Sequence, residues 1–232
     1  MKKILLIGDS IRMGYDVLVK EAFRDKAEVY FTYDNNRFAE YILRYLHEWK
    51  ESLSCGDDVD CVHWNVGLWD SLVLFEDGTL TPVDVYESYM ERICQRIKLL
   101  FPTAKVIFAT STPVDEARFT SPEKFVRYNS DIEEFNKAAI RAVKKYGHEI
   151  NDLYGLMKDQ PKEYHSDVTH YYSKNGATLL ADRVCEVIGK SMNIMPESID
   201  YGKWFDKSES YDGNEWLKKR YDGINDTGVL GV

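Results

Sequence analysis

The chain has 232 residues, of which 44% are hydrophobic and 13% aromatic, a composition typical of a globular protein with a sizeable buried core. Its formal net charge is −9, and no dense cluster of Lys and Arg interrupts the acidic excess. A nucleic-acid partner and an anionic membrane surface are both disfavoured for this reason. No stretch approaches the ~20 apolar residues that a membrane span needs.

The amino terminus superficially resembles a signal peptide. Lys2 and Lys3 precede the apolar run Ile4–Ile7, but the run stops at Gly8 and Asp9. It is too short for the apolar region of a signal peptide, so we expect a cytoplasmic protein. The four cysteines show no Cys-x-x-Cys and no Cys/His spacing suited to zinc. They predict buried, reduced thiols, and we expect neither a metal nor a cofactor.

Strand and helix signals alternate along the chain. Apolar, β-branched and aromatic runs predict five strands, at Ile4–Ile7, Ala27–Tyr33, Asp60–Gly67, Ala104–Thr110 and His148–Asn151. Apolar residues at helical spacing predict four longer helices, at Phe38–Trp49, Val83–Phe101, Asp131–Tyr146 and Ser173–Ile188. Such alternation is typical of an α/β fold in which a central parallel sheet is covered by helices on both faces.

Two regions lack this alternation. Residues 111–129 contain Pro113 and Pro122 and are predicted to form a long loop of the kind that shapes sites. Residues 192–232 are polar but too aromatic for a disordered linker, with Tyr201, Trp204, Tyr211, Trp216 and Tyr221. We therefore expect a principal domain over residues 1–191, with residues 192–232 packed against it as one or two short helices.

Three side chains predict nucleophilic chemistry. Ser10 directly follows the first strand, and ligands of an open parallel sheet gather beyond the carboxyl ends of its strands. Asp167 and His170 stand three residues apart, so the carboxylate can hold the imidazole in one tautomer. A nucleophile, a base and an orienting acid together predict a hydrolase. Taken singly, Asp9-Ser10 could simply cap a helix, and His170 could be a surface histidine.

The blocks Ile7-Gly8-Asp9-Ser10 and Asp167-Val168-Thr169-His170 resemble those of the SGNH hydrolases, also called the GDSL-like lipase/acylhydrolase family. The resemblance covers roughly the first 190 residues. It implies a flavodoxin-like three-layer α/β/α sandwich with about five parallel strands. It also implies that Ser10 is the nucleophile, His170 the general base and Asp167 the orienting acid, with no metal required. Family members deacylate lipids, thioesters, acetylated sugars and peptidoglycan.

The two middle blocks depart from the family pattern. Asn36 stands where the family has a glycine whose backbone N–H joins the oxyanion hole. The family's Gly-x-Asn-Asp becomes Gly67-Leu68-Trp69-Asp70, which lacks the asparagine donor. The Trp69 indole N–H is itself a donor, though a bulky one in a different place, and Asn65 is the other candidate replacement. The hole is therefore predicted from the backbone N–H groups of Ser10 and Asn36 and the amide of Asn65.

Several further residues are candidate substrate contacts, namely Asp9, Arg12, Arg37, Trp69 and His165. The two arginines suit an anionic or hydroxyl-rich substrate, and a solvated helix face explains them equally well. If Trp64, Trp69 and Tyr172 line the crevice, they favour a sugar-like substrate because aromatic faces stack on pyranose rings.

The leading hypothesis is a serine esterase that hydrolyses a small acyl ester, such as an acetylated carbohydrate, through a Ser-His-Asp triad. The rival hypothesis is a binding protein of the same fold, with a degenerate oxyanion hole, that holds carbohydrate or acyl ligands without turnover. A nucleotide-binding protein is disfavoured because no glycine-rich phosphate loop follows the first strand. The expected partner is a small-molecule ester, and the sequence does not predict an oligomeric state.

Overall fold

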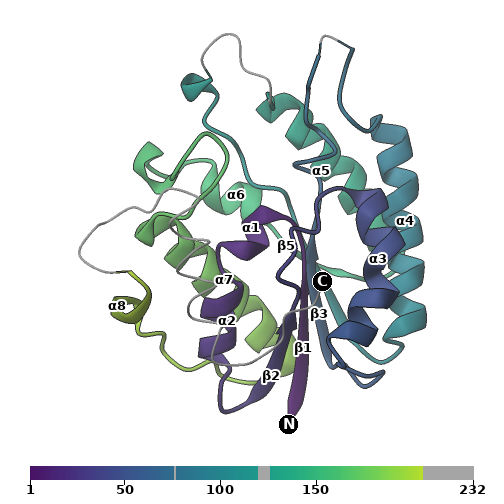
Figure 1. Cartoon of the computed structure of the whole chain (residues 1–232), viewed down its shortest axis with the longest axis vertical. Helices are drawn as coiled ribbons and strands as arrows, with labels where there is room; N and C mark the ends of the chain where they lie inside the picture. Colours follow the sequence, from purple (N-terminus) through teal and green to yellow (C-terminus); the bar gives the residue numbers. More distant parts are fainter. Residues whose placement is uncertain (76, 120–125, 206–232) are drawn as a thin grey trace.

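The centre of the molecule is a parallel sheet (Figure 1). The computed structural model describes residues 1–75, 77–119 and 126–205. The sheet consists of β1 (Lys2–Ile7), β2 (Ala27–Phe31), β3 (Cys61–Asn65), β4 (Lys105–Ala109) and β5 (Glu149–Asn151). Their order is β2-β1-β3-β4-β5, and every neighbouring pair is parallel. This is the flavodoxin-like order, in which the winding reverses between β1 and β3.

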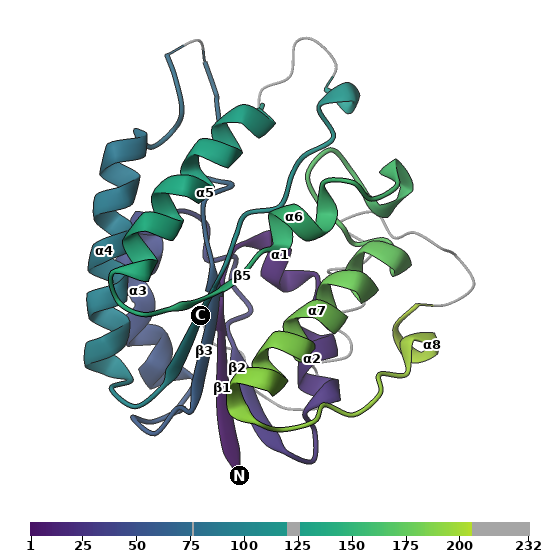
Figure 2. The same ribbon diagram turned by 180° about the vertical axis from the view of Figure 1, so that it is seen from behind.

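Helices cover both faces of the sheet and complete three layers (Figures 1 and 2). One face carries α3 (Ala39–Ser52), α4 (Val83–Leu100) and α5 (Asn129–Lys144), and the other carries α2 (Asp16–Ala22) and α7 (Lys174–Met192). Because strand side chains alternate between faces, Leu5 and Ile7 join one buried cluster while Ile4 and Leu6 join the other. The predicted α/β/α sandwich is confirmed.

The predicted strands and longer helices are all present, with ends shifted by a few residues. The prediction did not include the short elements α1 (Ser10–Met13), α2, α6 (Leu153–Met157) and the 3₁₀ turns η1 (Glu116–Arg118) and η2 (Lys162–Tyr164). For α2 the reason is burial. Three consecutive residues, Val17, Leu18 and Val19, are all buried, so α2 lacks the one-sided apolar stripe that a periodicity search detects. The short helix α8 (Tyr201–Trp204) lies in residues 192–232, where one or two short helices were expected.

The first part of the carboxyl-terminal extension packs along α2. The Glu197 N–H donates to the Ala22 carbonyl (2.7 Å), and the largely buried Trp204 indole donates to the Glu21 carboxylate. Three of the aromatics noted above lie outside the described residues: Tyr211, Trp216 and Tyr221. The packing of residues 192–232 as a whole therefore stays a prediction.

All four cysteines are buried and free, as their sequence context predicts. Within the described ranges, no helix combines the length and the apolar character that crossing a bilayer requires.

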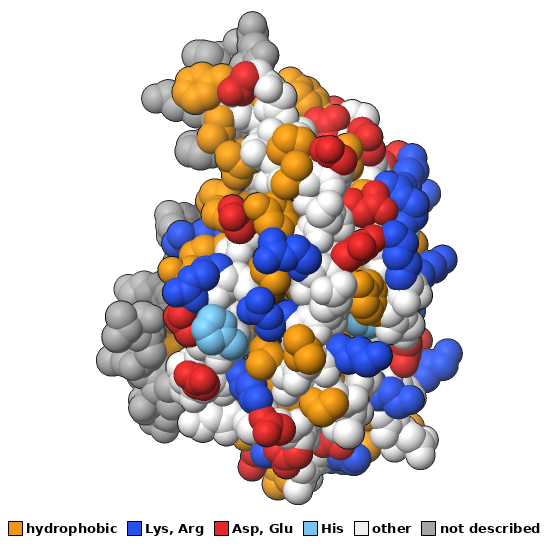
Figure 3. Space-filling view, turned by 90° about the vertical axis from the view of Figure 1, so that its right-hand side faces the viewer, with side chains coloured by type: hydrophobic (Ala, Val, Ile, Leu, Met, Phe, Trp, Pro, Cys, Tyr) orange, Lys and Arg blue, Asp and Glu red, His pale blue; other side chains and the backbone are white. Residues whose placement is uncertain are grey.

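The loop between β3 and α4 extends beyond the carboxyl ends of the strands (Figure 1). It carries three exposed large hydrophobic side chains, Leu74, Phe75 and Leu80. Figure 3 shows the adjoining face, on which positive and negative side chains are interspersed and apolar side chains gather toward the end that holds this loop.

Candidate active site

The site begins where β1 and β3 end side by side. The two strands are in register from Ile4–Cys61 to Ile7–Trp64, which brings Gly8 against Asn65. A Cβ atom built on Gly8 would lie 1.9 Å from Asn65 Oδ1, so only glycine fits at this position. The two strands approach each other closely here, and the chain continues from β1 through Gly8 into Asp9 and Ser10.

Asp9 turns the chain from β1 into the short helix α1. It is fully buried, and its carboxylate accepts hydrogen bonds from the Ile11 N–H (2.9 Å) and from the Asn65 amide nitrogen (2.8 Å). Burial raises the pKa of Asp9, and these two hydrogen bonds act in the opposite direction. Ser10 is therefore the first helical residue, and its backbone N–H has no helical acceptor of its own.

The side chains of Ser10, His170 and Asp167 lie together, although Ser10 and His170 are 160 residues apart in the sequence. Ser10 Oγ is 2.7 Å from His170 Nε2, and His170 Nδ1 is 2.8 Å from Asp167 Oδ2. The imidazole thus connects the hydroxyl to the carboxylate. Ser10 and His170 are both partly exposed, so a substrate can reach them.

The turn from Ser166 to His170 holds the acid in place. The second Asp167 oxygen, Oδ1, accepts the N–H groups of Thr169 and His170, each at 2.7 Å. Ser166 closes the turn by donating its N–H to the His170 carbonyl (2.8 Å). Burial would raise the pKa of Asp167, but the hydrogen bonds and charge of His170 lower it to about 2.

Tyr172 supports the histidine from below. Its ring stacks on the His170 ring with centroids 4.8 Å apart and planes 18° apart, and its hydroxyl donates to the Ser10 carbonyl (2.7 Å). Tyr172 is 2% exposed, so it does not line the crevice as the sugar-stacking hypothesis requires. Trp64 is also fully buried and packs edge-on against Phe108. Of the three aromatics considered for stacking, Trp69 alone is partly exposed.

The prediction that the Asn36 backbone contributes to the oxyanion hole is corrected by the structure. The Asn36 N–H donates to the Gly8 carbonyl (3.1 Å), while its side-chain oxygen accepts the Gly8 N–H (2.9 Å). These bonds fasten the loop after β2 to the end of β1 and leave the Asn36 N–H no hydrogen for an oxyanion. The next residue, Arg37, has a positive φ of 48°.

The predicted donor role of Asn65 is likewise corrected. The side chain is 1% exposed, its nitrogen donates to Asp9, and its oxygen lies 3.5 Å from the Tyr15 hydroxyl. Asn65 therefore positions Asp9, the residue before Ser10. Asp9 itself was a candidate substrate contact, and its complete burial contradicts that role.

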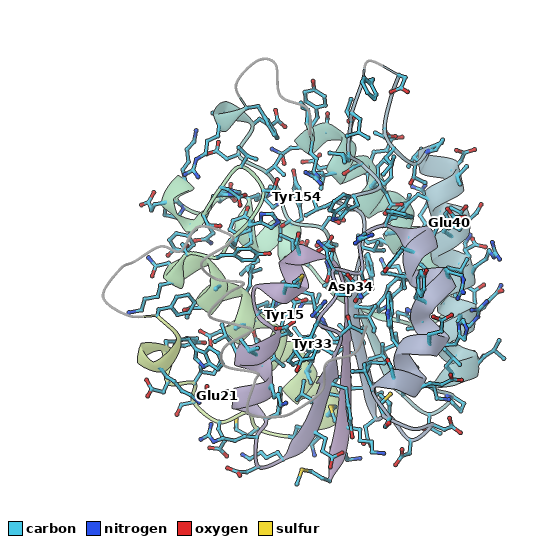
Figure 4. The ribbon with its side chains drawn as sticks, viewed as in Figure 1. Tyr15, Glu21, Tyr33, Asp34, Glu40 and Tyr154 are labelled. Atoms are coloured by element: carbon cyan, nitrogen blue, oxygen red, sulfur yellow. The ribbon has the colours of Figure 1, made fainter. Side chains whose placement is uncertain are left out.

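Arg12 was predicted to face the crevice and does not. It is fully buried, pairs with Asp16, and donates to the carbonyls of Thr32 (2.8 Å) and Asp34 (2.6 Å). Asp34, labelled in Figure 4, belongs to the loop that follows β2. Buried charges are tolerated where such partners satisfy them, so Arg12 fastens this loop to α1.

Two other candidate contacts have structural neighbours. Arg37 is exposed, and its guanidinium lies 5.1 Å from the centre of the Tyr41 ring. The partly buried His165 ring lies 4.0 Å from that of Tyr171, and burial lowers the pKa of His165 to about 4. His165 is thus a neutral, packed side chain near neutral pH.

Asp70 shows what the third block does in this chain. Its carboxylate accepts the Ala39 N–H at the start of α3 (3.0 Å) and the Thr81 hydroxyl (2.9 Å). Burial raises the pKa of Asp70 to about 7. Asp70 therefore joins the β3–α4 loop to α3.

Sequence reasoning overlooked Arg127. This residue lies in the predicted site-shaping loop, is 7% exposed, and donates its Nε–H to the Leu68 carbonyl. Its guanidinium carbon is 5.9 Å from the centre of the Trp69 ring. An arginine in a long loop gives no periodic signal, so the pattern offered no means of assigning it to the site.

Comparison with known proteins agrees with this architecture. No family model matches the chain. In sequence, the chain is 24% identical over 226 residues to a mouse protein named isoamyl acetate-hydrolyzing esterase 1 homolog, which covers 90% of this chain and 89% of that protein.

Solved structures give the same result at the level of the fold. A lipase/acylhydrolase from Enterococcus faecalis has a TM-score of 0.63 at 24% identity, covering 85% of this chain and all of that one. An acetyl xylan esterase has a TM-score of 0.60 at 18% identity, covering 80% of this chain and 99% of that one. The chain thus has the fold of the SGNH hydrolases, the GDSL-like lipase/acylhydrolases. The proteins that share this likeness are named as enzymes that act on ester bonds.

The contact between Gly8 and Asn65 gives a test of this architecture. Gly8→Ala is expected to lower the free energy of unfolding by roughly 1–3 kcal/mol, because the new Cβ would overlap Asn65 Oδ1. In an Asn65→Ala background that overlap is absent, so Gly8→Ala should cost less there, with a coupling of about 1 kcal/mol or more. Urea unfolding of the wild type, both single variants and the double variant measures the coupling. Strictly additive losses would contradict the packing described.

Proposed function

We propose that the protein is a serine esterase that hydrolyses small acyl esters, with Ser10 as nucleophile, His170 as general base and Asp167 as the acid that orients His170. The observation that carries the proposal is the continuous hydrogen-bonded series from Ser10 Oγ to the Asp167 carboxylate, with steps of 2.7 and 2.8 Å. With the neutral imidazole protonated on Nδ1, Nε2 is free to accept the Ser10 proton.

The reaction follows from this geometry. Ser10 Oγ bonds to the carbonyl carbon, its proton passes to His170 Nε2, and the carbonyl π electrons move onto oxygen to form a tetrahedral oxyanion. When the carbonyl re-forms, the bond to the alcohol oxygen breaks and the alcohol leaves with the proton from His170. Water then attacks the acylated Ser10, again giving a proton to His170. That proton returns to Ser10 as the carboxylic acid is released.

We propose an acetyl group as the acyl part of the substrate. Two similar proteins are named for acetyl esters with different alcohols, isoamyl acetate in one and acetyl xylan in the other. The alcohol part would be a carbohydrate in the finer form of this proposal. The partly exposed Trp69 ring supports it as a surface on which a sugar could stack, whereas the buried Trp64 and Tyr172 lend no support.

One observation favours the rival binding function. Among the predicted oxyanion donors, the Asn36 N–H is bonded to Gly8, and the Asn65 amide is bonded to Asp9. Losing one such donor typically costs ~3 kcal/mol of transition-state stabilisation. A protein with an incomplete hole would bind acyl or carbohydrate ligands with little turnover, so turnover itself distinguishes the two functions.

Covalent labelling tests the nucleophile. An aryl phosphonate is expected to label the wild type on Ser10, located by peptide mass spectrometry, and the protein is expected to hydrolyse p-nitrophenyl acetate. Ser10→Ala should lower kcat by ~10³-fold or more. Ser88→Ala, at an exposed serine on α4, is the matched control and should keep full activity. Ligand binding by a wild type that neither labels nor turns over would favour the binding protein.

The acid of the triad gives a second test. The pKa of Asp167 is about 2, so its carboxylate stays ionised across the useful pH range and can orient the His170 ring throughout it. Asp167→Asn should lower kcat by up to ~10⁴-fold, because an amide no longer holds the imidazole in the tautomer that accepts the Ser10 proton. The steady-state rate with p-nitrophenyl acetate measures the loss. Wild-type kcat in a folded Asp167→Asn would count against this pairing.

A further inference from the structure

The tetrahedral oxyanion needs more stabilisation than the predicted donors supply. A water-excluded site stabilises such a charge with hydrogen-bond donors or cations that already point toward it. The bonds made by Asn36 and Asn65 leave the backbone N–H of Ser10 as the predicted donor that remains. A four-residue helix such as α1 adds only a small dipole.

Arg127 is fixed firmly beside the third block. The residue before it, Val126, pairs with Val73 through two backbone hydrogen bonds of 2.8 and 3.1 Å. The Arg127 Nε–H donates to the Leu68 carbonyl, and the guanidinium lies over the Trp69 ring. Both ends of the loop from Leu68 to Val73 thus hold Arg127, so little conformational freedom remains to be lost during the reaction.

The loop that holds Arg127 begins at the end of the sheet where Ser10 lies. It follows directly from Asn65, whose side chain touches Gly8 and bonds to Asp9, and so it begins where β1 ends. The positive charge of Arg127 acts on the carboxylates of Asp9 and Asp167. Asp9 precedes Ser10, and Asp167 holds His170. The charge of Arg127 is therefore felt at the carboxylate next to Ser10 and at the one that holds His170.

The guanidinium is a buried charge without an ion pair in the part of the chain that the structure describes, where no carboxylate oxygen lies within 4.0 Å of it. Burial lowers the pKa of Arg127 to about 10, so it remains a cation at neutral pH. Burying an unpaired charge is costly in free energy. A cation held at such a cost suits a place where negative charge arrives during the reaction.

We propose that Arg127 is a catalytic residue whose guanidinium stabilises the oxyanion formed when Ser10 attacks the ester. The inference rests on the proposed esterase function and deepens it. In the transition state the His170 imidazolium is paired with the Asp167 carboxylate, so the new charge on the carbonyl oxygen is the one that lacks a partner. With Nε committed to Leu68, the terminal nitrogens of Arg127 carry the donors available to that oxygen.

The test compares Arg127→Met and Arg127→Gln with Arg141→Met, which removes an exposed arginine of α5 that pairs with Glu87. For the neutral ester p-nitrophenyl acetate, both Arg127 variants should lose ~10²-fold or more in kcat with little change in KM, and Arg141→Met should match the wild type. The rate of phosphonate labelling at Ser10 should fall in parallel, since the phosphonyl oxygen takes the place of the oxyanion. Added guanidinium ion should restore part of the lost rate.

The outcomes separate the two proposals. Wild-type kcat and labelling rate in a folded Arg127→Met or Arg127→Gln would overturn the role of Arg127 while leaving the esterase intact. A rise in KM confined to anionic esters, with kcat for the neutral ester unchanged, would also overturn it and make Arg127 a reader of substrate charge. A wild type that neither labels nor turns over would end the esterase proposal and this inference with it. If Arg127→Met does not fold, as judged by circular dichroism, Arg127→Gln decides the comparison. If both variants lose activity, recovery of kcat on adding guanidinium ion supports the role of Arg127, and no recovery contradicts it.

Discussion

A buried hydrogen bond from the Asn65 amide to the Asp9 carboxylate joins the end of β3 to the residue that precedes Ser10, the proposed nucleophile. The rest of the site depends on this bond, because Asp9 also caps α1 and so sets the direction in which Ser10 leaves the sheet. Gly8 makes the bond possible, since any side chain there would occupy the space of Asn65. The parallel pairing of β1 and β3 supplies the alignment that all three residues need.

The opposite side of the site is held by a second set of contacts. The turn at Asp167 uses both carboxylate oxygens, one for the backbone and one for the His170 ring, so the imidazole is fixed in position and tautomer. Tyr172 lies beneath that ring and donates to the Ser10 carbonyl, which couples the position of His170 to that of Ser10. A reaction that transfers a proton across 2.7 Å benefits from this rigidity.

The loop after β3 gives this chain its own version of the site. Asp70 ties the loop to α3, and Trp69 occupies the position where an amide donor was expected. The aromatic ring and the nearby Leu68 carbonyl together hold Arg127. We propose that Trp69, which stands in place of the expected amide donor, helps to position the guanidinium of Arg127. Arg127 would then stabilise the oxyanion instead of that amide.

Parts of this arrangement follow from the sequence, and others depend on tertiary contacts. The strands could be predicted because residues buried on both faces must be apolar, and the first and last blocks placed Ser10, Asp167 and His170 at strand and helix boundaries. The partners of Asn36, Asn65 and Arg12 could not be predicted, because each lies on a segment distant in the chain. Arg127 was overlooked for a related reason, since a loop has no periodicity to indicate which side chain turns inward.

Trapping the acyl-enzyme tests directly whether Ser10 is the nucleophile. The protein is mixed with p-nitrophenyl acetate, quenched with acid within the first turnovers, and digested for peptide mass spectrometry. We expect a transient acetyl group on Ser10, with rates of formation and decay that are consistent with kcat. Steady hydrolysis with Ser10 unmodified at every quench time, even when release of the acyl group is slowed by Asp167→Asn, would contradict it.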